Sequence, residues 1–475
     1  MSSLKDIKIS LIFPSYRSAK DPVSIREAKQ NLGVIPPLSL AYVAAILESK
    51  DCKVDLIDAS ALNLTKYQVL NRINAFGPDF LGFTTTTIDF HHTLDWIRYL
   101  KEETGIPVII GGIHISVYPK ETLTYEAIDY GIVGEAEETL PEFLEYLVNK
   151  KDLSKVSGIC YREDSRIVVT ANRAPFRNLD DSPFPARHLL SNEKYYSLIS
   201  KKKNFTAMMT SRGCPFHCIF CDNHTIEYRC RSPRNVVDEI GQCQRLFKIN
   251  EIDIFDALFS VNPNRVIEIC REIRQRKLEI SWSFRTRVDL VNARMLDELR
   301  ESGCMRIYYG IESGDRDILK NINKEIDIET VKRIVNITKD KGIDVFGYFM
   351  IGNIGETEES IKKTTNLILE LPLDYVQITP VFAPPNTVLY EMLRKKIHRD
   401  YWKEYTLDQT MRDMLPRYGT SLTDEEIKKK VRECYLKFYL RPGYIAKKMI
   451  ELKSFDEFFR SLRAIKDMVF SYYME

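Results

Sequence analysis

The sequence lacks the features that mark several large classes of protein. No hydrophobic run reaches the roughly 18 residues that a membrane-spanning helix needs. The first residues lead into a predicted strand without an apolar leader, so we expect no signal peptide. Its 69 basic and 67 acidic residues leave a net charge of +2, which attracts no nucleic acid. We also find no repeat and no low-complexity tract. These absences predict a protein with no transmembrane segment and no nucleic-acid partner.

A disulfide framework is excluded as well. Ten cysteines in 475 residues are too few for one. Seven of them are scattered, mostly in apolar contexts: Cys52, Cys160, Cys230, Cys243, Cys270, Cys304 and Cys434. Reduced core cysteines of this kind predict a cytoplasmic location. The hydrophobic share of 44% and the charged share of 29% are those of an ordinary globular protein.

Alternating strands and helices divide the chain into four predicted parts. Residues 1–150 carry continuous apolar strands joined by helices, which is typical of a doubly wound parallel sheet in an α/β fold. Residues 151–200 predict a hairpin followed by a proline-bearing linker. Residues 201–393 contain six further strands with crossover helices and predict a partial (β/α)6 barrel, open on one side. Residues 394–475 predict a helical segment.

The remaining three cysteines have the spacing C-x3-C-x2-C. They are Cys214, Cys218 and Cys221. Three thiolates can each bind one corner of an iron–sulfur cube and leave the fourth iron open, whereas clusters that only transfer electrons usually have four cysteines. Gly213 suits a tight loop at the first cysteine. The alternative is a zinc site completed by His217 or His224, which we disfavour because structural zinc prefers paired hooks.

In the first predicted domain, small and hydroxyl-bearing residues gather at the carboxyl ends of strands, where open α/β sheets bind ligands. The candidates are Pro37, Ser39, Thr84, Thr85, Thr86, Gly111, Gly112, His114 and Glu135. The paired glycines permit a bulky ring to approach the backbone, and the hydroxyls can bond a phosphate or an amide. No G-x-G-x-x-G follows the first strand, so a dinucleotide is disfavoured. Each piece alone is also compatible with an ordinary turn.

Together these motifs resemble the cobalamin-binding radical S-adenosylmethionine (SAM) enzymes. The cysteine loop, with Phe220 before its last cysteine, is similar to the radical SAM signature, and the strand-end set is similar to the cobalamin-binding domain of that family. The resemblance runs from residue 6 to about residue 460. It implies a Rossmann-like cobalamin domain and a radical SAM barrel. It also implies a [4Fe-4S] cluster, SAM and cobalamin as cofactors, and a flavodoxin- or ferredoxin-type electron donor.

The resemblance also implies roles for residues of the barrel. Gly310, Glu312 and Ser313 fall in the segment that holds SAM, with Glu312 suited to the ribose hydroxyls. Asp256 is a candidate for the SAM ammonium, and either Arg285 or Arg287 for its carboxylate; we prefer Arg285. A helix N-cap is the alternative reading of both Asp256 and Glu312.

The chain departs from free-standing cobalamin domains in one respect. Those domains carry D-x-H-x-x-G after the first strand, and its histidine binds cobalt. The nearest match here, Asp89-Phe90-His91-His92, follows the third predicted strand and lacks the glycine. We therefore expect His91 and His92 to be surface residues that open a helix, and cobalt to have no histidine ligand.

The implied reaction is radical methylation of an unactivated carbon. Ring closure, oxidation or rearrangement, as in the anaerobic porphyrin-ester cyclase, is the alternative, and a non-catalytic cobalamin sensor or carrier is the alternative outside enzymes. Methylthiotransferases need three N-terminal cysteines, but only Cys52 precedes residue 150, so that class is excluded. The aromatic C-terminal segment allows a lid for a small-molecule or lipid-like substrate, or peripheral contact with a membrane. We favour the simpler reading, the packed face of a helix.

Overall fold

The computed structural model describes residues 4–16, 33–411 and 417–451, and its contacts form two compact units. Of the described residues, the first unit comprises 4–16, 34–195 and 398–411, and the second comprises 33, 196–397 and 417–451. The domain boundaries predicted at residues 150, 200 and 393 stay predictions. No helix of the described residues combines the length and the apolar composition that crossing a bilayer requires.

The first unit is built on a seven-stranded sheet. Its strands are β1 (Lys8–Phe13), β3 (Lys53–Asp58), β4 (Phe80–Thr84), β5 (Val108–Gly111), β6 (Tyr130–Ile132), β7 (Ile159–Glu163) and β8 (Arg166–Val169). They lie in the order β3-β1-β4-β5-β6-β7-β8, and the first five are parallel. This order changes direction between β1 and β4, as in doubly wound folds, which confirms the predicted fold class. The predicted hairpin, β7 and β8, extends the sheet antiparallel to β6.

Helices cover both faces of this sheet. They are α2 (Leu38–Glu48), α3 (Lys66–Phe76), α4 (Phe90–Thr104), α5 (Ile113–Val117), α6 (Pro119–Thr122) and α7 (Ala136–Val148). Helix α2 contacts α7, and α3 contacts α4. Right-handed crossovers place these two pairs on opposite faces, because the chain moves in opposite directions from β1 to β3 and from β3 to β4. The face under α3 and α4 is a continuous apolar core that includes Ile12, Leu81 and Trp96.

A helix from far along the chain completes the first unit. Helix α15 (Tyr401–Leu407) contacts α6. The Tyr118 hydroxyl donates to Asp400 at 3.1 Å, and Lys403 pairs with Glu121 at 3.1 Å. Sequence patterns gave no sign of this pairing, since it joins segments about 280 residues apart.

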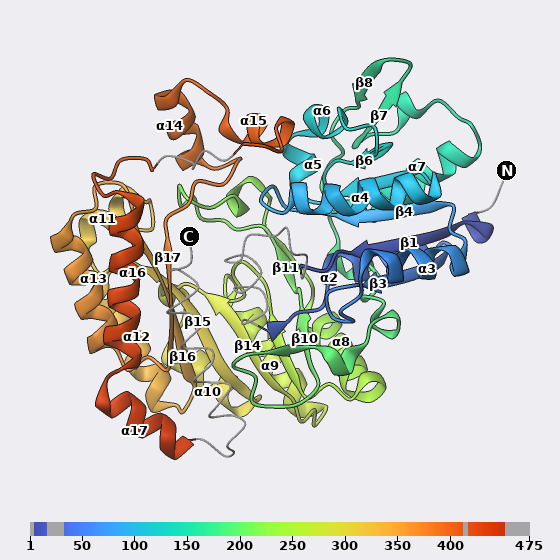
Figure 1. The fold of residues 1–475 in the computed structure, drawn as a ribbon. Helices are drawn as coiled ribbons and strands as arrows, with labels where there is room; N and C mark the ends of the chain where they lie inside the picture. The colour runs from blue at the N-terminus through green and yellow to red at the C-terminus, as the bar shows by residue number, and fades with distance from the viewer. Residues whose placement is uncertain (1–3, 17–32, 412–416, 452–475) are drawn as a thin grey trace. The chain divides into compact units, whose positions relative to one another are not determined.

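The second unit is a half-barrel of six parallel strands (Figure 1). These are β10 (Phe205–Met208), β13 (Glu251–Ile254), β14 (Ser281–Thr286), β15 (Cys304–Glu312), β16 (Asp344–Ile351) and β17 (Tyr375–Pro380), side by side in that order. Short pairs are formed by β11 (Ser211–Arg212) with β12 (Arg229–Cys230), and by β2 (Gly33–Val34) with β9 (Tyr196–Ser197). Because β10 and β17 do not pair, the barrel stays open, as the sequence predicted.

Helices pack on the outer side of the half-barrel. The unit also contains α14 (Val388–Ile397), α16 (Asp424–Tyr439) and α17 (Pro442–Glu451), which follow β17 in the chain. The helices of the outer side are α8 (Pro233–Phe247), α9 (Pro263–Gln275), α10 (Ala293–Glu301), α11 (Arg316–Asn321), α12 (Ile328–Asp340) and α13 (Glu358–Glu370). Apolar residues of alternate strand positions, such as Trp282 and Phe284 on β14, pack beneath them in one core. The other positions of β14, Ser283 and Arg285, are left for the inside of the barrel.

The open edge at β17 is covered by α16 (Figure 1). The Tyr439 hydroxyl accepts from Val376 N at 3.2 Å and donates to Val376 O at 3.1 Å. The Tyr435 hydroxyl, one turn earlier, does the same at Ile378, at 2.8 and 3.1 Å. Two side chains thus replace the hydrogen bonds of a missing neighbouring strand. The packed-face interpretation of the C-terminal aromatics is confirmed here, while those from Phe455 onward lie outside the described residues.

Candidate active site

The three motif cysteines lie on a loop whose base is held closed. Strands β11 and β12 pair Ser211 with Cys230 and Arg212 with Arg229 on either side of it. At Gly213 the backbone has φ +73°, and a Cβ atom would stand 2.2 Å from Ile226 O. Only glycine satisfies both conditions, so this residue lets the loop close tightly at the first cysteine.

The three thiols lie near one another. Burial raises the pKa of Cys214 above its usual value, and the nearby Cys221 and Cys218 raise it further. Burial also raises the pKa of Cys218, whereas the positive charges of Lys324 and Arg287 oppose that rise. No group of three or more metal-ligating side chains in the described residues converges on one point, as a single-ion site does. A cubane differs from such a site, because each thiolate binds a different iron. The donor set therefore fits an iron–sulfur cluster.

Phe220, the aromatic residue of the motif, is partly buried. It packs against the core of the half-barrel, as does Ile219. The Asn223 amide donates to the Cys221 sulfur at 3.4 Å. The loop is thereby fixed by apolar packing on one side and by polar contacts on the other.

Glu312 lies at the end of β15 in a strained conformation. Its φ is +68°, a region that non-glycine residues seldom adopt, and the pairing of β15 with β16 shifts register there. Its carboxylate accepts from the Lys324 ammonium at 3.1 Å, and both side chains are largely buried. A Cβ atom at Gly310 would stand 2.6 Å from this carboxylate and 2.9 Å from the ammonium. Strain of this kind concentrates at functional sites.

The capping alternative predicted for Asp256 and Glu312 is wrong, because other residues cap the helices that follow them. Asn262 caps α9, and Asp315 caps α11 through bonds to Asp317 N and Ile318 N at 2.9 and 3.2 Å. Ser313, which is fully buried, accepts from Asp315 N at 3.2 Å and so fixes the turn after Glu312.

Asp256 is buried beneath the strand that enters the cysteine loop. Its two oxygens accept from the Thr210 amide at 2.6 Å, the Ser211 amide at 3.0 Å and both hydroxyls of these residues. Burial raises the pKa of this carboxyl, and Arg265 opposes the rise. These contacts position the segment before Gly213. Binding of the SAM ammonium by Asp256 stays a prediction, and it requires some of these bonds to be exchanged.

Arg285 points into the half-barrel from β14. It makes a bidentate pair with Asp253 at 2.9 and 3.0 Å, and its guanidinium stacks between Phe255 and Tyr308, 3.9 and 4.5 Å from the ring centroids. The positive charge of Arg285 is thus already paired with the negative charge of Asp253. Pairing of Arg285 with the SAM carboxylate stays a prediction, as does the alternative through Arg287.

The strand-end residues of the first unit lie together at the carboxyl edge of its sheet. Thr84 ends β4 beside Gly111, which ends β5. Gly112 has φ +101°, and a Cβ there would stand 2.6 Å from Thr85 O. A Cβ at Gly111 would instead meet one atom within 4 Å, Phe83 O at 3.9 Å. The edge therefore has an open position of the kind that a bulky ring requires.

The other candidates of this edge differ in exposure. Thr86 is exposed and bonds Asp89 at 2.8 Å, whereas Thr85 is buried and accepts from Thr93 at 3.1 Å. His114 is fully buried and lies 4.1 Å from Phe90 in a stack, and burial lowers its pKa to about 3.

His114 is neutral as a result, and it is held by Thr87 at 3.3 Å. Its Nε2 atom has no hydrogen-bond partner among the described residues, so one polar atom at this edge is left for a ligand.

The remaining candidates frame the same edge. Pro37 precedes α2, and Ser39 is exposed in the first turn of that helix. Glu135 precedes α7 and accepts from Phe176 N at 2.7 Å. His91 and His92 do open α4, but they are half-buried: His92 stacks on Tyr16 with centroids 4.8 Å apart.

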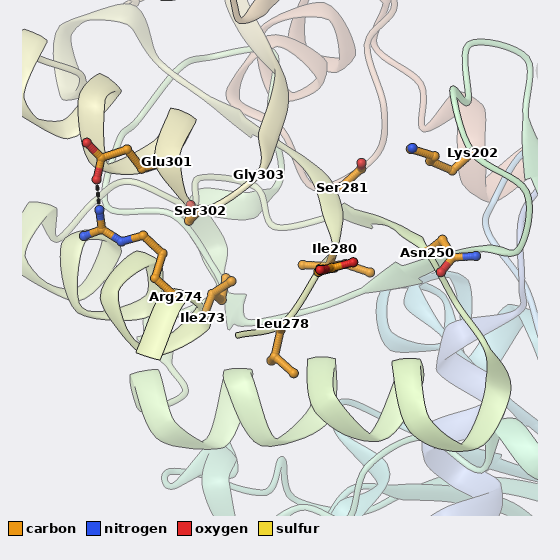
Figure 2. Close-up of a pocket in the computed structure, with 11 residues that line it drawn as sticks. Lys202, Asn250, Ile273, Arg274, Leu278, Ile280, Ser281, Glu301, Ser302 and Gly303 are labelled. Atoms are coloured by element: carbon orange, nitrogen blue, oxygen red, sulfur yellow. Dashed lines mark ion pairs between the residues drawn. The ribbon is translucent and has the colours of Figure 1, made fainter. Parts of the chain in front are cut away.

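A cavity of about 540 Å³ lies at the opposite end of the half-barrel (Figure 2). Its lining comes from segments that precede β10, β13, β14 and β15: Lys202, Asn250, Ile273, Arg274, Leu278, Glu279, Ile280, Ser281, Glu301, Ser302 and Gly303. An ion pair between Arg274 and Glu301 lies at its margin. Barrel enzymes react at the carboxyl ends of their strands, so this cavity is not part of the candidate active site.

Sequence reasoning missed the partners of the predicted residues. Two of these partners bond candidate residues: Lys324 bonds Glu312, and Asp253 bonds Arg285. A third, Asn323, bonds the cysteine loop at His217 O. Asp253 alternates with apolar neighbours on its strand, a pattern from which an inward position could have been found. Lys324 lies in a short turn after α11, where no local pattern distinguishes a buried lysine from an exposed one.

Comparisons with known proteins agree with this arrangement. The radical SAM superfamily matches residues 208–368, and the B12 binding domain matches residues 31–144. An uncharacterised methyltransferase of Pyrococcus horikoshii is 32% identical over 99% of this chain and 100% of its own length. The anaerobic magnesium-protoporphyrin IX monomethyl ester cyclase of Rubrivivax gelatinosus is 26% identical over 92% of this chain and 78% of its own.

Two solved structures share the fold at low sequence identity. The cobalamin-dependent SAM radical enzyme OxsB has a TM-score of 0.75 at 18% identity and covers 99% of this chain and 72% of its own. The radical SAM methyltransferase TsrM of Kitasatospora setae has a TM-score of 0.66 at 17% identity, over 82% and 76% of the two chains.

The full-length similarity and the two family matches agree with the cysteine loop, the half-barrel and the doubly wound sheet. They establish an enzyme whose cofactors are a [4Fe-4S] cluster, SAM and cobalamin. This chain belongs to the cobalamin-binding radical SAM enzymes.

Proposed function

We propose that the protein methylates an unactivated carbon of a small-molecule or lipid-like substrate by a radical route. The observation that carries this proposal is the similarity, over the whole chain, to a protein named as a methyltransferase. A second methyltransferase supports it: cytidylyl-2-hydroxyethylphosphonate methyltransferase of Streptomyces wedmorensis is 26% identical over 77% of this chain and 78% of its own length. Bound together, the cofactors would supply a 5′-deoxyadenosyl radical and a methyl group carried by cobalamin.

The chain's own residues would bind and orient these groups. Cys214, Cys218 and Cys221 would hold the cluster. Glu312, held by Lys324, would accept hydrogen bonds from the ribose of SAM, and Gly310 leaves room for this pair. In the first unit, the open position beside Gly111 would admit cobalamin, with the hydroxyls of the neighbouring threonines as hydrogen-bond partners.

A cyclase, oxidase or rearrangement activity is the second candidate. The cyclase of Rubrivivax gelatinosus, which matches 92% of this chain, favours it. We further propose a flavodoxin- or ferredoxin-type protein as the electron donor and the cytoplasm as the location. All ten cysteines are free thiols; seven of them are buried, and Cys230 is exposed. A reducing compartment suits this composition.

Nucleoside analysis distinguishes the two candidates. The reconstituted protein is supplied anaerobically with dithionite, SAM, cobalamin and a small-molecule extract. A radical methyltransferase releases S-adenosylhomocysteine and 5′-deoxyadenosine in about equal amounts, because one SAM donates the methyl group and another the radical. A cyclase or mutase releases 5′-deoxyadenosine alone. Substrate consumption without S-adenosylhomocysteine would reject the methyltransferase in favour of the second candidate.

A further inference from the structure

The turn after α11 is joined to both neighbours of Cys218. Ile219 N donates to Ile322 O at 3.1 Å, and the Asn323 amide donates to His217 O at 2.7 Å. The next residue of the turn, Lys324, is held by Arg287, which donates to its carbonyl at 2.8 Å. The position of this turn relative to the central cysteine is therefore fixed by hydrogen bonds on both sides of it.

Arg287 joins the turn to the loop a second time. Its guanidinium lies 4.1 Å from the ring centroid of Phe216, two residues before Cys218. Arg287 thus contacts Phe216, and the turn bonds His217 and Ile219. A displacement of Lys324 would require several of these contacts to break together.

The charged side chain of Lys324 is almost completely buried from solvent. It is 6% exposed and is the only lysine counted as buried in the described part of the chain. A buried charge acts through a lower effective dielectric than one at the surface, so its field is screened little. Its ammonium bonds Glu312 at 3.1 Å. The turn that carries Lys324 bonds His217 O and Ile219 N, on the two residues beside Cys218.

We propose that Lys324 is a positioning residue that sets the reduction potential of the cluster, and that the negative charge of Glu312 opposes its effect. A [4Fe-4S] cluster becomes more negative by one charge when it takes one electron from a reductant. A fixed ammonium beside it stabilises the reduced form, and a carboxylate beside it destabilises that form. This role rests on the cluster and not on methyl transfer, so it stands or falls independently of the substrate.

Redox titration of the reconstituted full-length protein, without SAM, tests the proposal. Dithionite and mediators supply the electrons, and electron paramagnetic resonance measures the reduced fraction. Lys324→Met should lower the reduced-to-oxidised ratio at a fixed potential about tenfold, which is about 59 mV for a one-electron couple. Glu312→Gln should raise the ratio.

Two controls separate charge from shape. Lys324→Arg keeps the charge and should keep the wild-type ratio to within about twofold. Lys320→Met removes an exposed lysine at the end of α11 and should also leave the ratio unchanged, because water screens that charge. A shift in Lys324→Arg equal to that in Lys324→Met would overturn the proposal.

A direct comparison of the two main variants gives the remaining outcomes. A wild-type ratio in Lys324→Met, or a shift of the same sign in Glu312→Gln, would overturn the role of charge. If Lys324→Met assembles no cluster, Glu312→Gln decides: a raised ratio supports the proposal, and an unchanged or lowered ratio rejects it.

Discussion

Substitutions at two neighbouring glycines, at the end of β5, should affect different properties of the protein: stability in one case and cobalamin binding in the other. Both are candidates for the cobalamin site, and sequence alone treats them alike. The structure distinguishes them. Gly112 has φ +101° and leaves no space for a side chain, whereas Gly111 is not in the positive-φ region and has a single neighbouring atom, at 3.9 Å.

The magnitudes follow from this difference. Alanine at Gly112 would take a backbone conformation reserved for glycine, at a cost of about 1–3 kcal/mol. It would also place Cβ 2.6 Å from Thr85 O and 2.8 Å from the Thr84 hydroxyl, and the backbone oxygen cannot rotate away. Alanine at Gly111 meets neither obstacle, so the free energy of unfolding should change by at most about 0.5 kcal/mol. Leucine at Gly111 would fill the open position itself.

Urea unfolding and spectrophotometric titration with hydroxocobalamin, both on the full-length chain, measure the two effects. We expect Gly112→Ala to lower the unfolding free energy by at least about 1 kcal/mol even without cobalamin. Gly111→Leu should keep most of the stability and weaken cobalamin binding at least about tenfold, by steric exclusion. Wild-type affinity in a folded Gly111→Leu protein would refute the assignment of the open position to cobalamin.

Three further predictions concern the second unit. Burial raises the pKa of Glu356 to about 7, so the folded state keeps a proton that the unfolded state releases near pH 4.5. The free energy of unfolding should therefore fall by up to about 3 kcal/mol as pH rises between these values. Urea unfolding at pH 5 and pH 8 should show this fall in the wild type and not in Glu356→Gln. Tyr439→Phe should lower the unfolding free energy by about 1–3 kcal/mol, because two buried backbone groups of Val376 lose their partner; a melting temperature equal to that of the wild type would contradict the edge-covering role. Alanine at any motif cysteine should abolish the [4Fe-4S] absorbance and alanine at Cys243, a buried cysteine of α8, should not; a cluster retained in the triple variant of Cys214, Cys218 and Cys221 would exclude these ligands.

The fold was predictable because its signals are local. Apolar strands such as β14, with Trp282 and Phe284 in alternation, and capped helices between them can be read from short windows. The loop of Cys214, Cys218 and Cys221 was predictable for the same reason, since its spacing within eight residues already restricts the chemistry. Gly213 also followed from local sequence, and the structure gives its reason in the close approach of Ile226 O.

The remainder depends on contacts between distant segments. No pattern near Lys324 reveals that its turn bonds the cysteine loop about a hundred residues earlier. Asp256 stays a candidate for the SAM ammonium, but no local pattern reveals that the amides and hydroxyls of Thr210 and Ser211, about 45 residues earlier, bind its oxygens. The hydroxyls that cover β17 come from a helix about 60 residues further on. Such pairings are decided by packing, which single-sequence patterns do not contain.

Transfer of a labelled methyl group tests the central claim most directly. The reconstituted protein, reduced with dithionite and supplied with cobalamin and a substrate-containing extract, is given SAM whose methyl group carries three deuterium atoms. The account predicts a product that has gained the intact deuterated methyl group on carbon. A product formed in step with 5′-deoxyadenosine but without any of the label would contradict it.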